Sequence, residues 1–254
     1  MGIGAGISLF YAKAGARVVI NARGLDNLEA QKAAIEKDVI DAQIVLVAGD
    51  ITDPEVGKRV VAAALSAWGR LDIVIANSAT LMGGTGRFGE KDLLRWWHTQ
   101  EVNVRGVLNI IHPSIPELLK TKGQIIVTSS TVAHVRQPLI ADYSVSKHTI
   151  NRFVEILALD YPEITIYAVH PGSTMTPGAA SFVESAGLKG VYPMADAIEL
   201  PAATYLWLTA RNAEFLSGRY VQATWDLNEV LAKKDEIVRD NLLVTKLAGP
   251  VKSS

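Results

Sequence analysis

Short runs of apolar residues alternate along this chain with longer stretches in which apolar residues recur every three or four positions. The short runs predict buried strands at residues 17–21, 44–48, 73–76, 125–128, 164–169 and 220–223. The longer stretches predict helices at residues 7–14, 25–37, 54–68, 90–111, 143–161 and 195–209. Short apolar strands between helices are typical of a parallel sheet covered by helices on both faces. We therefore expect an α/β fold that binds its ligands at the carboxyl ends of the strands.

Glycine and proline mark several of the predicted helix ends. Gly15 and Gly69 each follow an apolar stretch, where a helix commonly ends in left-handed backbone. Pro54 suits the first turn of a helix that has Asp53 as its capping residue. Pro113 predicts an end to the long helix that begins at residue 90.

The composition narrows the class of protein. The 254 residues contain no low-complexity linker, so we expect a single domain over 1–254 with an amphipathic helical tail at about 226–254. A formal net charge of −1 argues against a dedicated nucleic-acid-binding protein. The chain has no cysteine and its five histidines lack metal-binding spacing, so no disulfide and no metal site are expected. Without an apolar run of membrane-spanning length or a signal-peptide pattern, a cytoplasmic protein that does not bind membrane is expected.

Ser130, Tyr143 and Lys147 form the most specific chemical pattern in the chain. Tyr143 and Lys147 are four residues apart, so they share one face of a predicted helix. A phenol beside a fixed positive charge has a lowered pKa, which makes it a usable proton donor and acceptor. Ser130 follows a predicted strand, from whose end its hydroxyl can hold a substrate carbonyl. Together they indicate carbonyl–alcohol interconversion; the alternative is an amphipathic helix with a half-buried tyrosine and a solvated lysine.

Residues near other predicted strand ends suit a dinucleotide. Gly2-Ile3-Gly4 leads into a helix, where glycines let a phosphate approach the helix N-terminus; a flexible N-terminus is the alternative. Arg23 follows the strand at 17–21, and an arginine there suits a ribose 2′-phosphate, which favours NADP(H) over NAD(H); a solvated surface arginine is the alternative. Asp50 suits an adenine amino group, or alternatively a helix cap.

Two asparagines and one glycine-rich run complete the candidates. Asn77 follows the strand at 73–76, and Asn103 lies inside a predicted apolar helix, where its amide must find partners. The run at 84–89 spells G-x-G-x-x-G, but it lies far past its strand and no strand with an acidic end follows. We therefore interpret this run as a mobile loop at the rim of the site.

Taken in chain order, these residues resemble the short-chain dehydrogenase/reductase family, and the segment at 215–226 resembles its fungal members. The matching positions are Gly2-Ile3-Gly4, Asp50-Ile51, Asn77, Asn103, Ser130, Tyr143, Lys147 and the run Pro171-Gly172-Ser173-Thr174-Met175-Thr176. The family folds as a Rossmann-like doubly wound parallel sheet that binds NAD(P)(H). The resemblance therefore implies this fold in a single domain, with a substrate lid at about 177–200.

The resemblance also implies a role for each matched residue. Tyr143 is the expected general acid/base, and Lys147 is expected to lower its pKa and to hold the nicotinamide ribose. Ser130 is expected to orient the carbonyl, and Asn103 to support a proton-relaying chain of waters. The expected cofactor-binding residues are Gly2, Ile3, Gly4, Arg23, Asp50, Ile51, Asn77, Tyr143, Lys147, Pro171, Gly172, Thr174 and Thr176.

The chain departs from the family at its N-terminus. The family's nucleotide loop reads T-G-x-x-x-G-x-G after a first strand, whereas here Met1 directly precedes the final G-x-G. The first strand, which lies centrally in the family's sheet, is therefore expected to be missing, and two strands lose a ladder partner. One explanation is a start at an internal methionine of a longer protein, which truncates the nucleotide-binding loop. The other is a degenerate member that binds the cofactor poorly.

The sequence thus predicts an NADP(H)-dependent oxidoreductase that interconverts a carbonyl and a secondary alcohol on a small or medium substrate. Apolar residues of the lid segment favour a lipophilic substrate; they are Phe182, Val183, Leu188, Val191 and Tyr192. The resemblance implies a homodimer or homotetramer formed through the helices at 90–111 and 143–161. Two alternatives stay open: a non-catalytic binding protein with a degraded cofactor site, and a redox-neutral epimerase or dehydratase on the same scaffold.

Overall fold

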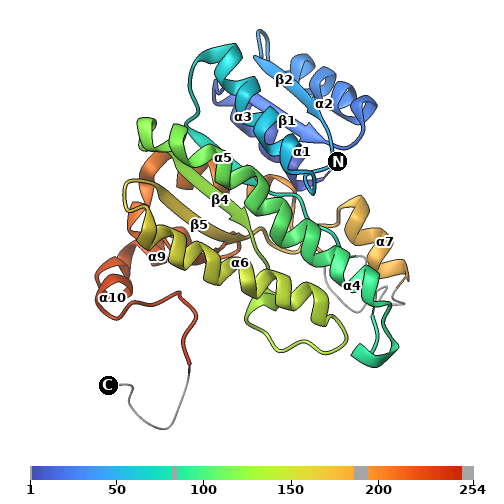
Figure 1. The fold of residues 1–254 in the computed structure, drawn as a ribbon. Helices are drawn as coiled ribbons and strands as arrows, with labels where there is room; N and C mark the ends of the chain where they lie inside the picture. The colour runs from blue at the N-terminus through green and yellow to red at the C-terminus, as the bar shows by residue number, and fades with distance from the viewer. Residues whose placement is uncertain (1, 82–84, 186–193, 248–254) are drawn as a thin grey trace.

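The computed structural model describes residues 2–81, 85–185 and 194–247, which form six strands in two parallel sheets (Figure 1). The first sheet pairs β1 (Val18–Ala22) with β2 (Ile44–Ala48). The second has the order β3 (Ile73–Ala76), β4 (Gln124–Thr128), β5 (Thr165–His170) and β6 (Arg219–Gln222). Each predicted strand is confirmed to within one residue at both ends.

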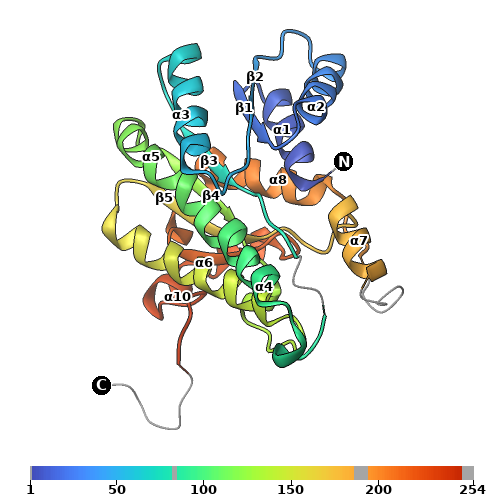
Figure 2. The ribbon, with the colours of Figure 1, turned by 45° about the vertical axis from the view of Figure 1, so that its right-hand side comes forward.

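Helices cover both faces of the strands (Figure 2). They are α1 (Ile3–Lys13), α2 (Leu25–Asp38), α3 (Pro54–Trp68), α4 (Leu93–Gln100), α5 (Gly106–Thr121), α6 (Ala141–Asp160), α7 (Pro177–Ser185), α8 (Glu199–Trp207), α9 (Leu227–Ala232) and α10 (Lys234–Arg239). Strands alternate with helices in sequence and run parallel in space, so the Rossmann-like α/β fold class is confirmed. Among the described residues, no helix is both long enough and apolar enough to cross a membrane.

The core lies on the two faces of the four-stranded sheet. In β4, Ile125 and Val127 pack with α5 and α6, whereas Ile126 packs with α1 and α8 on the opposite face. This alternation follows from the two-residue period of a strand. Because both faces are covered, every residue of β4 and β5 is buried. The apolar composition of these strands is thus accounted for by a position inside the sheet.

The sheet is divided at the place where the family keeps its first strand. Among the described residues no strand lies between β1 and β3, and each of these strands is an edge of its own sheet. Between them lies a cavity of about 820 Å³, lined by residues of both strands. Ile7 and Tyr11 of α1 line it from one face, and Val107 of α5 lines it from the other. The expected gap in the sheet is therefore confirmed for the described residues.

A few polar contacts connect the N-terminal elements to the rest of the molecule. The Tyr11 hydroxyl donates to the carbonyl oxygen of Tyr205 at 3.0 Å and lies 2.6 Å from the hydroxyl of Thr209. On the opposite face, Nδ2 of Asn109 in α5 donates to the carbonyl oxygens of Ile51 and Thr52 at 2.8 and 3.0 Å. These contacts connect the N-terminal elements to the four-stranded sheet, but they do not replace the backbone hydrogen bonds that a strand between β1 and β3 would form.

The long helix predicted at 90–111 is wrong in its continuity and in its end. A π-helical turn at Glu101–Arg105 separates α4 from α5, and α5 continues through Pro113 as far as Thr121. A proline at this position cannot donate to the carbonyl oxygen of Asn109, one turn earlier. Gly57 of α3 packs against that oxygen, because a Cβ at Gly57 would lie 2.0 Å from it. The helix nevertheless continues, and Ile115 and Leu118 of its later turns are buried in the core.

Candidate active site

Ser130, Tyr143 and Lys147 come together at the carboxyl end of β4. Lys147 Nζ lies 5.6 Å from the centroid of the Tyr143 ring and donates to the carbonyl oxygen of Thr128, the last residue of β4, at 2.7 Å. The Ser130 side chain hydrogen-bonds with the Tyr143 phenol. Lys147 is only 1% exposed, so the alternative of a solvated lysine is wrong. The predicted grouping of the three side chains is therefore present.

The protonation of this group differs from the prediction. Burial raises the pKa of Tyr143 to about 12, and the hydrogen bond with Ser130 lowers it by a smaller amount. Burial also lowers the pKa of Lys147 to about 8, because an ammonium is poorly solvated there. The predicted lowering of the Tyr143 pKa by Lys147 is not observed, since desolvation of the phenol is the larger effect in this structure.

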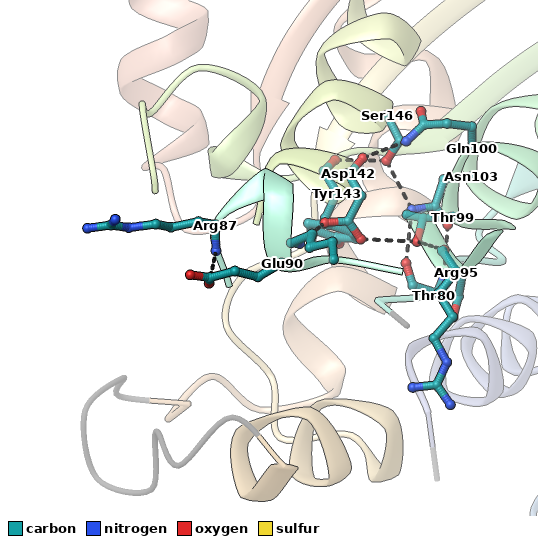
Figure 3. A network of polar contacts seen from close by, with 11 residues as sticks. Thr80, Arg87, Glu90, Arg95, Thr99, Gln100, Asn103, Asp142, Tyr143 and Ser146 are labelled. Atoms are coloured by element: carbon teal, nitrogen blue, oxygen red, sulfur yellow. Dashed lines mark hydrogen bonds and ion pairs between the residues drawn. The ribbon is translucent and has the colours of Figure 1, made fainter. Parts of the chain in front are cut away.

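Asn103 lies in the π-helical turn between α4 and α5 and is fully buried. Its Oδ1 accepts from the Thr80 backbone N–H at 2.7 Å, and its Nδ2 donates to Thr80 O and Ser146 Oγ, both at 3.0 Å. Ser146 Oγ in turn donates to the carbonyl oxygen of Tyr143 at 2.7 Å (Figure 3). The prediction that this amide finds partners is confirmed. One hydroxyl group connects Asn103 to the backbone of Tyr143, while its role in a water chain stays a prediction.

The N-terminus of α1 lies beside the ends of β3 and β4. Gly2 is the capping residue of α1 and supplies no side-chain cap, so the first N–H groups of this helix are not covered by a side chain. A Cβ at Gly4 would lie 2.9 Å from Nδ2 of Asn77, so a larger residue there would displace the Asn77 amide. Oδ1 of Asn77 accepts from Thr128 Oγ1 at 3.1 Å. Ile3 packs into the core beneath the helix.

Arg23 and Asp50 follow the neighbouring strands β1 and β2. The pKa of Asp50 lies below its ordinary value because Thr52 donates a backbone hydrogen bond to its carboxylate, with smaller contributions from the Thr52 hydroxyl and from Arg23. Asp53 rather than Asp50 caps α3, by accepting from the N–H of Glu55 at 2.9 Å. The side chain of Ile51 packs partly into the core instead of lying open at the strand end.

The run from Pro171 to Thr176 leaves β5 in a tightly fixed turn. Gly172 has φ +88°, and a Cβ there would lie 2.8 Å from Oδ2 of Asp196. The same carboxylate oxygen accepts from the N–H of Ser173 at 2.6 Å. Thr176 caps α7 by accepting from the N–H of Ala179 at 3.1 Å. The sequence offered no signal for the contribution of Asp196, which is distant in the chain.

Several of these features fit a nicotinamide dinucleotide. The hydroxyl of Thr174 is buried and has no hydrogen-bond partner among the described residues, so it is available to a ligand. The uncapped first turn of α1 offers N–H groups of the kind that bind a pyrophosphate. Arg23 is exposed at the end of β1, where a ribose phosphate can reach it. Within the described residues, no group of three or more acidic, histidine or cysteine side chains is arranged to hold a metal ion.

Sequence reasoning missed a cluster of polar residues beneath Tyr143. Asp142, which directly precedes Tyr143, is fully buried and ion-paired with Lys91. Thr99 and Gln100 of α4 also bond to Asp142. These partners come from a segment more than 40 residues away, so no local pattern could have revealed them.

Comparison with known proteins identifies relatives over most of the chain. The family described as short chain dehydrogenase matches residues 1–187. Short chain dehydrogenase pigC of Monascus ruber is 31% identical over 258 residues, which cover 96% of this chain and 82% of that protein. Short chain dehydrogenase andI of Emericella variicolor is 31% identical over 252 residues, covering 96% of this chain and 85% of that protein.

Solved structures have the same fold. The KRED1-Pglu enzyme is 27% identical, with a TM-score of 0.72 over 87% of this chain and 96% of that chain. Levodione reductase has a TM-score of 0.81 at 20% identity, over 87% of this chain and 91% of that chain, which is a likeness of fold alone. The order of the site residues, their grouping at the strand ends and these relatives agree. The chain belongs to the short-chain dehydrogenase/reductase family of oxidoreductases and resembles its fungal members.

Proposed function

We propose that this oxidoreductase interconverts a carbonyl and a secondary alcohol with NADP(H) as cofactor. The observation that carries the proposal is the phenol of Tyr143, which hydrogen-bonds with Ser130 and whose ring centroid lies 5.6 Å from the buried Nζ of Lys147. A proton donor, a second hydroxyl and a positive charge in one place match the needs of carbonyl reduction.

In this proposal, residues of the chain transfer the proton and orient the substrate oxygen. During reduction, the Tyr143 hydroxyl gives its proton to the carbonyl oxygen, and during alcohol oxidation the phenolate takes a proton back. Ser130 donates a hydrogen bond to the same substrate oxygen. Lys147 would hold the nicotinamide ribose through its ammonium, which lies 5.6 Å from the centroid of the Tyr143 ring. Bound NADP(H) supplies or accepts the hydride at the carbonyl carbon.

Residues from both sheets hold the cofactor in this proposal. The first turn of α1 binds the pyrophosphate, Asp50 lies at the adenine end, and Asn77 and Thr174 lie at the nicotinamide end. Ile51, Pro171, Gly172 and Thr176 form the walls through their backbone. Arg23 pairs with the 2′-phosphate, which favours NADP(H) over NAD(H).

A lipophilic substrate of small or medium size fits the lid segment. Val183 of α7 is buried and Phe182 beside it is half-buried, so apolar side chains face the body of the protein here. Leu188, Val191 and Tyr192 lie outside the described residues.

We also propose that the protein is a cytoplasmic homodimer or homotetramer. Large apolar side chains are exposed on the two helical regions expected to form the interface. On the first, Leu94 is 82% and Trp97 61% exposed; on the second, Leu159 is 76% exposed. Large apolar side chains exposed on both helical regions support this proposal, because subunit interfaces bury such side chains. Sedimentation-equilibrium measurement of a monomer would contradict this proposal.

The first test is a fluorescence titration of the 254-residue chain with NADPH and, in parallel, with NADH. Saturable binding that is tighter for NADPH is expected, together with NADPH consumption equal to the alcohol formed from a panel of apolar ketones. Arg23→Ala should weaken NADPH binding about tenfold and leave NADH binding unchanged. A folded protein that binds neither cofactor would contradict the proposal and favour the non-catalytic alternative. Product formation without NADPH consumption would favour a redox-neutral reaction.

A further inference from the structure

The carboxylate of Asp142 is the most deeply buried charge close to Tyr143. It is 0% exposed, and its Oδ1 accepts from Nζ of Lys91, itself 2% exposed, at 2.6 Å. Its Oδ2 accepts from the hydroxyl of Thr99 at 3.1 Å. A third bond joins Nε2 of Gln100 to the carbonyl oxygen of Asp142 at 2.8 Å. We call Asp142 and these three partners the Asp142 cluster. A buried carboxylate is retained only where such partners compensate its lost hydration.

The cluster lies where the helix that carries Tyr143 begins. The residue before α6, Ile140, makes no side-chain hydrogen bond to cap the helix, and Leu139 has φ +70°. A helix without a capping side chain frays in its first turn unless other contacts hold it. Asp142 is the acidic residue of this turn, and a carboxylate there also interacts favourably with the helix dipole.

A second group of bonds holds the same turn from the other side. Asn103 donates to Ser146 Oγ, which donates to the carbonyl oxygen of Tyr143. The segment from Lys91 to Asn103 therefore bonds to the start of α6 at Asp142 and at Ser146, as Figure 3 shows for the labelled residues. The direction of the Tyr143 side chain depends on this turn, because its backbone is part of it.

We propose that Asp142 is a positioning residue for Tyr143, and that it acts through its buried bonds to Lys91 and Thr99. The cluster fixes the first turn of α6 against α4, so that the phenol is held at the distance from Ser130 and Lys147 that proton transfer requires. Small displacements of a reacting group reduce rates strongly, so the cluster contributes to turnover without touching the substrate. The link to turnover rests on the proposed function, whereas the link to the position of the helix turn does not.

Variants that keep the fold separate positioning from stability. Removing one partner alone leaves a buried charge unpaired and destabilises the fold. The principal variant is therefore K91M/D142L, which replaces both partners by apolar side chains of similar volume. Thr99→Val removes the hydroxyl that bonds to Asp142 and keeps the shape of the side chain, whereas Thr99→Ser keeps a hydroxyl at this position. The matched control is E55L/K58M, because Lys58 and Glu55 of α3 form an ion pair of the same 2.6 Å length that is largely exposed.

Hydrogen exchange read by mass spectrometry tests the position of the turn directly. In K91M/D142L, amides of residues 141–147 should exchange at least about fivefold faster than in wild type, while those of β4 keep their wild-type rates. With a ketone that wild type reduces, kcat should fall about 10- to 100-fold while the Kd for NADPH stays unchanged. Thr99→Val should show the same changes more weakly, and Thr99→Ser and the control should behave as wild type.

Two results would overturn the proposal. One is unchanged exchange at 141–147 in K91M/D142L; the other is faster exchange in β4 to the same extent, which would mean that the cluster stabilises the whole fold. Wild-type protein that reduces none of the ketones would contradict the proposed function alone, since the exchange rates still decide whether Asp142 positions the turn.

Discussion

The N-terminal unit, from α1 to β2, and the four-stranded sheet are built from the same kind of parallel strands, yet they are packed very differently. Each residue of β1 is only half-buried, whereas each residue of β4 and β5 is buried. The core cluster around β1 and β2 contains three buried residues, Ala12, Ile35 and Ile44, compared with sixteen in the cluster around β3, β4 and β5. The difference in burial follows from the number of neighbouring strands, because β4 and β5 each have a strand on both sides, whereas β1 has a strand on one side only.

The two regions also have different proposed roles in the site. The side chains proposed to move protons belong to the four-stranded sheet and to α6, which the core and the Asp142 cluster hold firmly. The residues proposed to bind the adenine end of the cofactor follow β1 and β2, in the less buried unit. We therefore expect changes in the first region to affect turnover and global stability, and changes in the second to affect cofactor binding and local stability.

Replacing Tyr143 gives the largest expected effect. Tyr143→Phe keeps the ring and removes the proton donor, so kcat for ketone reduction should fall about 100- to 10,000-fold. The Kd for NADPH, measured by fluorescence titration, should stay at its wild-type value, because cofactor contacts at the strand ends remain. Retained turnover in this variant would refute the assignment of Tyr143.

A matched pair of isoleucine substitutions compares the two regions directly. Ile126 of β4 is 0% exposed, so Ile126→Ala should lower the free energy of unfolding by about 3–5 kcal/mol. Ile20 of β1 is half-buried and borders the cavity, so Ile20→Ala should lower it by only about 1 kcal/mol. Urea denaturation measures both values. Equal losses would show that the N-terminal unit is packed as well as the four-stranded sheet.

Filling the cavity between the two sheets should reduce the difference in burial between the N-terminal unit and the four-stranded sheet. An N-terminal extension of five apolar residues, matching the length of β1, followed by a short glycine turn into Gly2, can pair with β1 and β3. Burial of its side chains, less the entropy of ordering it, should stabilise the protein by about 2 kcal/mol and tighten NADPH binding. The control is the same extension with proline at its centre, which cannot form the ladder. Identical stability of the two would contradict strand pairing in the cavity.

The smallest expected effect is a pH dependence that originates at Lys147. Its pKa is lowered to about 8 in the folded protein, so above that pH the unfolded chain binds more protons than the folded chain. Stability therefore rises with pH through this group, and wild type should gain about 1 kcal/mol relative to Lys147→Met between about pH 7 and pH 9. Urea denaturation of both proteins at each pH measures the difference. A constant difference across this range would contradict the lowered pKa.

Helix and strand positions were predictable because their signals are local. The strands at 44–48 and 73–76 and the helix from Pro54 to Trp68, with its Asp53 cap and Gly69 end, occur as predicted. The end of the helix predicted at 90–111 was not predictable, because the helix continues past Pro113 where Ile115 and Leu118 are buried in the core. Residue spacing likewise predicted the pairing of Tyr143 with Lys147 but not the pKa of Tyr143, which burial decides.

The α/β class, the order of the elements, the family and the candidate site residues could all be derived from the sequence alone. Each of these depends on periodicity, spacing or residue type, which are properties of the chain read in order. Three features became visible only once the chain was folded: the buried pair of Lys91 and Asp142, the bond of Asp196 to the loop after β5, and the cavity between β1 and β3. Those features join residues that are far apart in the chain, and burial of a charge or an edge depends on what the fold places beside it.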